Sequence, residues 1–207
     1  MSPLPLPLVR AADLPPPLRE VLRPGASLHD RAGRARVLPA AFLRVDSWEQ
    51  AQETRLTPHF KLSELIEVDV REAQAARDFP RYVPCALLLL ASALELLRLE
   101  AGTYVHVAAN GGYRSPAHAR SRHASRHCWG TAANIYRIGD SWLDNREEIE
   151  RYAALARRAI PGVWVRPCGP GDGEADDHLH IDLGYTVFDP VDGQEARSDA
   201  NAQEGEG

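Results

Sequence analysis

The chain has 207 residues, of which 44% are hydrophobic and 26% charged, as in a folded globular protein long enough to bury a core. Its net charge of −5 argues against a protein that binds nucleic acid by neutralising phosphates. The most apolar run, residues 83–99, contains Pro84, Glu95 and Arg98 and is too short and too charged to cross a bilayer.

The first 17 residues carry no recognisable export signal. They are rich in proline and lack both a basic start and an uninterrupted apolar stretch. We therefore expect a cytoplasmic protein as the sequence is written, or a protein of the cell envelope if another route exports it. The sequence gives no expectation for the oligomeric state.

Residues 1–56 are expected to form an N-terminal extension that packs on the main domain. Proline and leucine recur over residues 1–24, which favours an extended arm, although residues 18–22 could form a helical turn. Short β segments are expected between residues 27 and 45, with Gly33 in a turn.

The main domain is expected to cover residues 57–190. Residues 85–100 have the strongest helical pattern, with a wide apolar face, Pro84 at the start and Gly102 after the end. The other expected elements are a short helix that begins at residue 60, strands at residues 104–108, 131–138, 163–165 and 179–183, and a helix at residues 145–160.

The order of these elements predicts the fold class. Asp144 and Glu147 resemble a capping box at the start of the helix at residues 145–160. Helices come first, followed by strands with one helix between them, which indicates an α+β fold with a small, mainly antiparallel sheet and packed helices. Residues 191–207 are acidic, contain glycine and are expected to form a disordered tail.

Three polar side chains from separate segments have the pattern of a metal site. His127 precedes a predicted strand, Asn134 lies on that strand, and His180 lies on a later one. Zinc binds neutral imidazole well, and a catalytic zinc ion keeps three protein ligands and a water. Because pairing of the strands would bring the segments together, we expect these three side chains to surround one cation-sized space.

Four blocks of sequence resemble one known family. The blocks are Phe60-x-x-Ser63-Glu64-Leu65, Gly111-Gly-Tyr113-Arg114-Ser115-Pro116-x-His118, Ser125-x-His127-x-x-Gly130-x-Ala132-x-Asn134 and His178-x-His180-x-Asp182. Their order and spacing are similar to those of the zinc D-Ala-D-Ala carboxypeptidase and endolysin peptidase family, with its patterns FxxSEL, SGYRSPxHN, SxHxxGxAxD and a late H-x-H or E-x-x-H. The resemblance covers about residues 57–185 and implies a zinc D,D-peptidase-like fold.

The resemblance also implies a reaction and a partner. Members of that family hydrolyse peptide bonds in peptidoglycan peptides, often next to D-alanine, as carboxypeptidases or endopeptidases that use a zinc-bound water. Arg114 falls on the arginine that anchors or polarises the substrate, and Tyr113 and Ser115 belong to the same substrate-binding motif. The expected partner is therefore a cell-wall peptide, with neither nucleic acid nor a membrane span involved.

The chain departs from the family pattern at one metal ligand. The position of the expected aspartate is Asn134. A neutral amide oxygen attracts a cation less strongly than a carboxylate does, so zinc is expected to be weakly bound or absent. His178, His123 and Cys128 are the candidates for a substitute ligand.

Two acids are candidates for the catalytic base that moves the proton. The glutamate of the family's E-x-x-H pattern would fall on Asp177, which is one methylene shorter and is our first choice. Asp182 is the alternative, and it could instead orient a histidine. A further small departure is Gly111, which stands where the pattern has serine.

The sequence therefore leaves three functions open. The first is a weak zinc-dependent peptidase that acts on D-Ala-containing peptidoglycan peptides. The second is a catalytically impaired pseudoenzyme that binds a peptide or protein partner in the same cleft, because the expected aspartate is Asn134. The third is a structural or assembly protein, suggested by the proline-rich arm.

Overall fold

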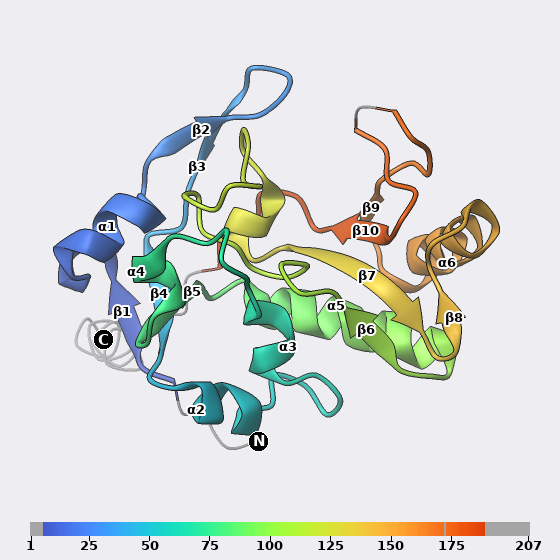
Figure 1. The fold of residues 1–207 in the computed structure, drawn as a ribbon, viewed down its shortest axis with the longest axis horizontal. Helices are drawn as coiled ribbons and strands as arrows, with labels where there is room; N and C mark the ends of the chain where they lie inside the picture. Colours follow the sequence, from blue (N-terminus) through green and yellow to red (C-terminus); the bar gives the residue numbers. More distant parts are fainter. Residues whose placement is uncertain (1–5, 172, 189–207) are drawn as a thin grey trace, which may run out of the picture.

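Small antiparallel sheets and several helices make up the computed structural model, which describes residues 6–171 and 173–188 (Figure 1). The predicted α+β class is thus confirmed. Within the described residues, no helix is long and apolar enough to cross a membrane. The predicted acidic tail at residues 191–207 lies outside the described part of the chain.

The largest sheet supports the predicted metal ligands. Its strands follow the order β6-β7-β10-β9. The short strand β8 lies off this path and pairs antiparallel with the end of β7. The strands are β6 (Val105–Val107), β7 (Ala132–Ile138), β8 (Ser141–Trp142), β9 (Trp164–Val165) and β10 (Leu179–Asp182). The four strands predicted in this part of the sequence are therefore present, and β8 is an addition that the sequence pattern did not indicate.

A second sheet joins the N-terminal section to the rest of the chain. Its order is β1-β4-β5, formed by β1 (Leu8–Arg10), β4 (Ala41–Val45) and β5 (Arg81–Pro84). The pairing of β4 with β5 crosses the predicted boundary after residue 56, and one hydrophobic cluster includes buried residues from both sides of it. Pro84 ends β5, so the prediction that it opens the next helix is wrong.

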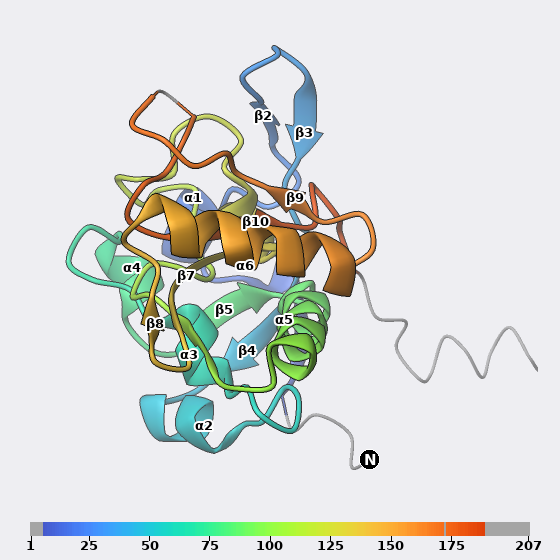
Figure 2. The same ribbon diagram turned by 90° about the vertical axis from the view of Figure 1, so that its right-hand side faces the viewer.

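The two long helices cover the largest sheet. Helix α5 (Leu87–Ala101) buries the predicted apolar face and ends at Gly102, whose φ of +67° closes the helix in the left-handed conformation. Helix α6 (Arg146–Ala159) begins at Asn145, whose side chain accepts a hydrogen bond from the backbone of Glu148. The cap is therefore one residue later than the predicted Asp144. Both helices lie alongside the sheet in Figures 1 and 2.

Shorter elements complete the fold. The helices are η1 (Ala11–Asp13), α1 (Pro16–Leu22), α2 (Trp48–Glu53), α3 (Leu62–Ile66), α4 (Gln74–Arg77) and η2 (Arg126–Trp129). The helical turn considered near residues 18–22 is α1. Strands β2 (Ser27–His29) and β3 (Ala35–Val37) form the predicted hairpin, with Gly33 in its turn at a φ of +75°.

The hairpin turn is fixed by one buried carboxylate. Asp30 accepts hydrogen bonds from the backbone of Ala32 and Arg34, each at 3.0 Å, and from the guanidinium groups of Arg34 and Arg36. Burial alone would raise the pKa of Asp30, but these hydrogen bonds outweigh it and lower the pKa to about 2. The carboxylate therefore stays ionised and fixes the conformation of the hairpin.

Candidate functional site

The pairing of β7 with β10 places two of the predicted ligands opposite each other. His180 pairs with Asn134 in the antiparallel register, and the Nδ1 atom of His180 lies 2.7 Å from the Oδ1 atom of Asn134. Directly paired residues on the same face of a sheet have adjacent side chains, so the strand register alone brings these two together.

The third predicted ligand reaches the same point from η2. His127 donates a hydrogen bond from Nδ1 to the carbonyl oxygen of Gly112 at 2.7 Å, which leaves its Nε2 lone pair unused. Its ring lies edge-on to that of His180, with ring centroids 5.2 Å apart. Burial lowers the pKa of both imidazoles well below the ordinary value, with further lowering by nearby arginines, so both rings are neutral near pH 7.

Asp182 lies behind His180 instead of reaching the cavity. It is 1% exposed, and its Oδ2 lies 3.3 Å from the Nε2 of His180. Its Oδ1 accepts a hydrogen bond from the backbone of Gly184 and lies 3.2 Å from the Nε of Arg126. This is the position of a group that orients a histidine, the second of the two roles considered for Asp182.

Asp177 is far more exposed than the first-choice base would need to be. Its side chain is 80% exposed and contacts the Nδ1 atom of its neighbour His178. The sequence argument placed a carboxylate beside the reacting bond, yet the cavity residues include neither Asp177 nor Asp182. Neither acid therefore lines the space in which a ligand would be held, although Asp182 contacts His180 from behind.

The donor set falls one ligand short of a catalytic zinc site. Two neutral imidazoles suit zinc, but the third group is a carboxamide, whereas protein zinc sites use Cys, His, Asp or Glu. Among the described residues, no three His, Cys, Asp or Glu side chains form a group that could hold a metal ion. The side chains present at this point therefore do not fit a three-ligand zinc site.

The carboxamide also gives the two histidines an alternative to a metal. The Nδ1 of His180 faces Asn134 and its Nε2 faces a carboxylate. An amide can accept a hydrogen bond through oxygen or, after rotation, donate one through nitrogen, so Asn134 matches either tautomer of His180. A carboxylate at position 134 could only accept. The cluster can thus satisfy its hydrogen bonds without a cation.

The three candidate substitute ligands have different surroundings. Cys128 is buried in an apolar cluster with Leu38, Ala124 and Trp129, and burial raises the pKa of its thiol to about 11. Cys128 is not among the residues that line the cavity, so its position does not support a role as the substitute ligand. His123 and His178 line the same cavity as the cluster. The Nε2 of His178 is buried without a hydrogen-bond partner among the described residues.

A large cavity opens beside the histidine cluster. Its volume is about 980 Å³, within the range of small-molecule sites in proteins. The residues that line it come from the β2–β3 hairpin, the loop that precedes β7 and the segments around β9 and β10: Asp30, Arg31, Ala32, Arg34, Arg114, Arg120, Arg122, His123, Ala124, Ser125, Arg126, His127, Asn134, Trp164, Arg166, Gly173, His178, His180 and Tyr185.

Arg114 is the deepest charge in this cavity wall. Its side chain is buried, with the residue 6% exposed, and its Nε has no hydrogen-bond partner among the described residues. Burial lowers its pKa to about 10, so the guanidinium still carries its charge at pH 7. A buried cation without an anionic partner is costly to the folded protein and is the group from which an anionic ligand gains most.

Tyr113 and Ser115, predicted to bind substrate beside Arg114, do not line the cavity. Tyr113 is packed in the main hydrophobic core. Ser115 is fully buried, and its hydroxyl donates to Glu72 at 2.6 Å. Both residues hold the loop in place and lie behind the ligand-facing surface, so their predicted contact with substrate is not supported by their positions.

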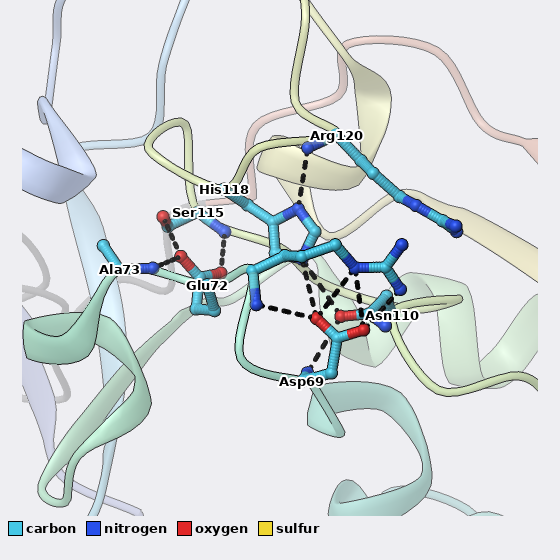
Figure 3. A network of polar contacts seen from close by, with 8 residues as sticks. Asp69, Glu72, Ala73, Asn110, Ser115, His118 and Arg120 are labelled. Atoms are coloured by element: carbon cyan, nitrogen blue, oxygen red, sulfur yellow. Dashed lines mark hydrogen bonds and ion pairs between the residues drawn. The ribbon is translucent and has the colours of Figure 1, made fainter.

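Glu72 is a central residue that the sequence argument missed (Figure 3). This buried carboxylate accepts hydrogen bonds from the backbone and hydroxyl of Ser115, at 2.9 and 2.6 Å, and from the backbone of Ala73 at 2.8 Å. It therefore fixes the turn that follows Arg114. No spacing pattern could have identified it, because 43 residues separate it from Ser115.

His118 closes the other side of the same loop (Figure 3). Its Nδ1 accepts a hydrogen bond from the backbone of Arg120, so its Nε2 carries the proton and donates it to the Oδ1 of Asn110 at 3.0 Å. Asn110 has a φ of +59°, in the left-handed region that asparagine adopts more readily than most residues. Asn110 also accepts from the backbone of Asp69.

The two glycines before Tyr113 allow the loop to press against its neighbours. A Cβ atom at Gly112 would lie 2.1 Å from the carbonyl oxygen of Leu65 in α3. A Cβ atom at Gly111 would lie 2.5 Å from the carbonyl oxygen of Ala108 and 2.8 Å from that of Asn134. The serine of the family pattern would therefore not fit at position 111 of this backbone.

Comparisons of the chain with protein-family models, with curated proteins and with solved structures find no match. The candidate site is therefore described by the geometry of its residues, without a relative for comparison. A buried, unpaired arginine and a cluster of two neutral histidines with one carboxamide line the same cavity.

Proposed function

We propose that this chain is a catalytically impaired relative of the zinc D,D-peptidases that binds the free carboxylate end of a peptide of the cell-wall type. The observation that carries the proposal is the buried, unpaired guanidinium of Arg114, which lines the cavity beside the histidine cluster. A guanidinium matches a carboxylate with two parallel hydrogen bonds. The resemblance of the sequence motifs supplies the class of peptide, which ends in D-alanine.

The state of the third ligand position favours binding over hydrolysis. Asn134 supplies an amide where a zinc peptidase needs a carboxylate, and that amide satisfies His180 directly at 2.7 Å. The two candidate bases, the exposed Asp177 and the buried Asp182, do not line the cavity, so neither is placed to carry a proton to a bound peptide. The ligand would be met in the cytoplasm, or in the cell envelope if the protein is exported.

Calorimetric titration with a peptide that ends in D-Ala-D-Ala tests the proposal. The matched control is the same peptide with a C-terminal carboxamide, which keeps every group except the negative charge. We expect the acid to bind at least about tenfold more tightly than the amide, since hydrogen bonds to charged groups contribute about 1.5–3 kcal/mol. Equal affinity for the two peptides would remove the proposed role of Arg114.

A variant of Arg114 separates the loss of this contact from a loss of the fold. Arg114→Lys keeps the charge but loses the fork of donors, so it should bind the acid peptide more weakly while remaining folded. Far-ultraviolet circular dichroism and thermal unfolding of the variant establish that it is folded. If folded Arg114→Lys bound the acid as tightly as the native protein, a general positive field, and not a specific carboxylate contact, would explain the binding.

The weak zinc peptidase, whether a carboxypeptidase or an endopeptidase, remains the second candidate. The buried Nε2 of His178, which has no hydrogen-bond partner among the described residues and lines the same cavity, favours it. Metal analysis of the purified protein separates the two candidates. Zinc at one equivalent that disappears in His178→Ala, together with cleavage of the peptide, would favour the peptidase; substoichiometric zinc and no cleavage are expected.

A further inference from the structure

The cavity wall concentrates positive charge in a protein that is negative as a whole. The chain has a net charge of −5, yet seven arginines line this cavity: Arg31, Arg34, Arg114, Arg120, Arg122, Arg126 and Arg166. Among the described lining residues, Asp30 alone carries a carboxylate, and Arg34 and Arg36 already engage it. A cavity with one sign of charge attracts ligands of the opposite sign.

These arginines come from three segments that are far apart in the sequence (Figure 1). Arg31 and Arg34 belong to the turn between β2 and β3, four others belong to the segment from residue 114 to residue 126, and Arg166 follows β9. The charges lie close enough to affect each other. Burial lowers the pKa of Arg166, the charges of Arg31 and Arg126 lower it further, and the carboxylates of Asp182 and Asp177 act in the opposite direction.

The described residues of the protein pair directly with only part of this charge. Arg34 pairs with Asp30, and Arg126 lies 3.2 Å from Asp182. The side chains of four other lining residues have no ion pair or hydrogen bond with the described residues: Arg114, Arg120, Arg122 and Arg166. Repulsion among like charges destabilises the folded protein, so an anion that enters the cavity gains the interactions that the protein does not make.

Aromatic rings complete the wall. Trp164 is 41% exposed and lines the cavity, as does Tyr185. The guanidinium of Arg126 lies between them, 5.2 Å from the centre of the Trp164 ring and 5.0 Å from that of Tyr185. Cation–π contacts of this kind hold a guanidinium in a fixed orientation, and the exposed part of Trp164 leaves aromatic surface in the wall that a flat ligand group can contact.

We propose that the cavity binds a small ligand with two or more phosphate groups and a flat ring, of the size of a nucleoside diphosphate. A phosphate group carries more charge than a carboxylate and offers three acceptor oxygens instead of two, so several guanidinium groups can share it. The cavity, which is open to solvent and has a volume of about 980 Å³, is large enough for a small molecule. The net charge of −5 disfavours a long polyanion.

This inference goes beyond the proposed peptide binding and does not depend on it. The phosphate groups would contact Arg120, Arg122 and Arg166, and the peptide carboxylate would contact Arg114. A variant of the exposed pair Arg120 and Arg122 therefore tests phosphate binding, while the acid and amide peptides test Arg114 separately. Failure of either leaves the other standing.

The experiment is a calorimetric titration of the full chain with uridine diphosphate, repeated with Arg120→Gln/Arg122→Gln. The matched control is Arg19→Gln/Arg158→Gln, which removes two exposed arginines that do not line the cavity. We expect the cavity variant to lower the affinity at least about tenfold and the control to change it less than about twofold, because only the former removes charge-assisted hydrogen bonds.

Four outcomes would overturn the proposal, the last of them concerning inorganic phosphate. The first is absence of binding to uridine diphosphate at millimolar concentration. The second is an equal loss in both double variants, which would indicate attraction by overall charge alone. The third is tighter binding of a tri-glutamate peptide than of uridine diphosphate, which would assign the cavity to carboxylates. Inorganic phosphate should bind more weakly than the diphosphate, and equal binding would contradict a site for two phosphate groups.

Discussion

The loop at residues 110–126 has two sides that differ in how completely their polar groups are satisfied. On the side that faces α3 and α4, Glu72, Ser115, Asn110 and His118 are joined by hydrogen bonds. On the side that faces the cavity, Arg114 is buried without such a partner. The comparison indicates that the first side stabilises the fold, whereas the second carries an unsatisfied charge at some cost in stability, which the proposed ligand would offset.

The strongest test of the packed side is Gly112→Ala. The added Cβ would lie 2.1 Å from a backbone oxygen of α3, which no side-chain rotation relieves. We expect the free energy of unfolding to fall by about 3 kcal/mol or more, measured by urea denaturation. Gly162→Ala is the matched control: its φ of +73° is also left-handed but the space is open, so about 1 kcal/mol is expected. Equal losses of unfolding free energy in the two variants would mean that the close contact at Gly112 does not contribute to the effect.

Glu72→Gln should have the next largest effect on the packed side. Glutamine keeps the shape but loses the charge that accepts from Ser115 and Ala73, so the free energy of unfolding should fall by about 2 kcal/mol. Glu20→Gln, on the exposed surface of α1, should change it by less than about 0.5 kcal/mol. A loss that is similar for both would show that Glu72 is not a structural anchor.

Arg114→Gln should have the opposite signature, because it removes a buried charge that lacks a partner. We expect the free energy of unfolding to stay the same or to rise by about 1 kcal/mol, while affinity for the acid peptide falls at least about tenfold. Urea denaturation and calorimetry on the same preparation provide both numbers. A large loss of stability would mean that Arg114 stabilises the fold, as the residues of the packed side do. The proposed difference between the two sides of the loop would then be wrong.

Asp30→Asn should give the smallest effect, and one that depends on pH. The pKa of Asp30 is lowered from 3.8 to about 2, so its stabilising contribution is present above pH 3.8 and is lost as the pH falls through 2. The native protein should therefore be more stable than the variant at pH 7, and the difference should shrink between pH 4 and pH 2. Thermal unfolding at several pH values measures this, and a difference that is independent of pH would contradict the ion pairs at Asp30.

The centre of the site was accessible from the sequence because local patterns fix it. Alternation of apolar residues identified β7 and β10, and their pairing places Asn134 beside His180. The spacing of His127 from β7 then brought the third group close. The α+β class followed from the same element order.

The surroundings of the site were not accessible, for reasons of distance and burial. Glu72 contacts Ser115 across 43 residues, and no periodicity links two positions so far apart. Motif position alone assigned Tyr113 and Ser115 to the substrate, although the loop turns both into the protein. The arginines of the cavity come from separate segments, so their meeting depends on tertiary structure that composition does not reveal.

The pairing of Asn134 with His180 has an evolutionary consequence. The codons for asparagine and aspartate differ by one base, and the strand register that presents position 134 belongs to the backbone, which that exchange leaves unaltered. A single nucleotide substitution would thus place an acidic side chain beside the two imidazoles of His127 and His180. Under the proposed relation to the zinc peptidases, this chain is one mutational step from their ligand set.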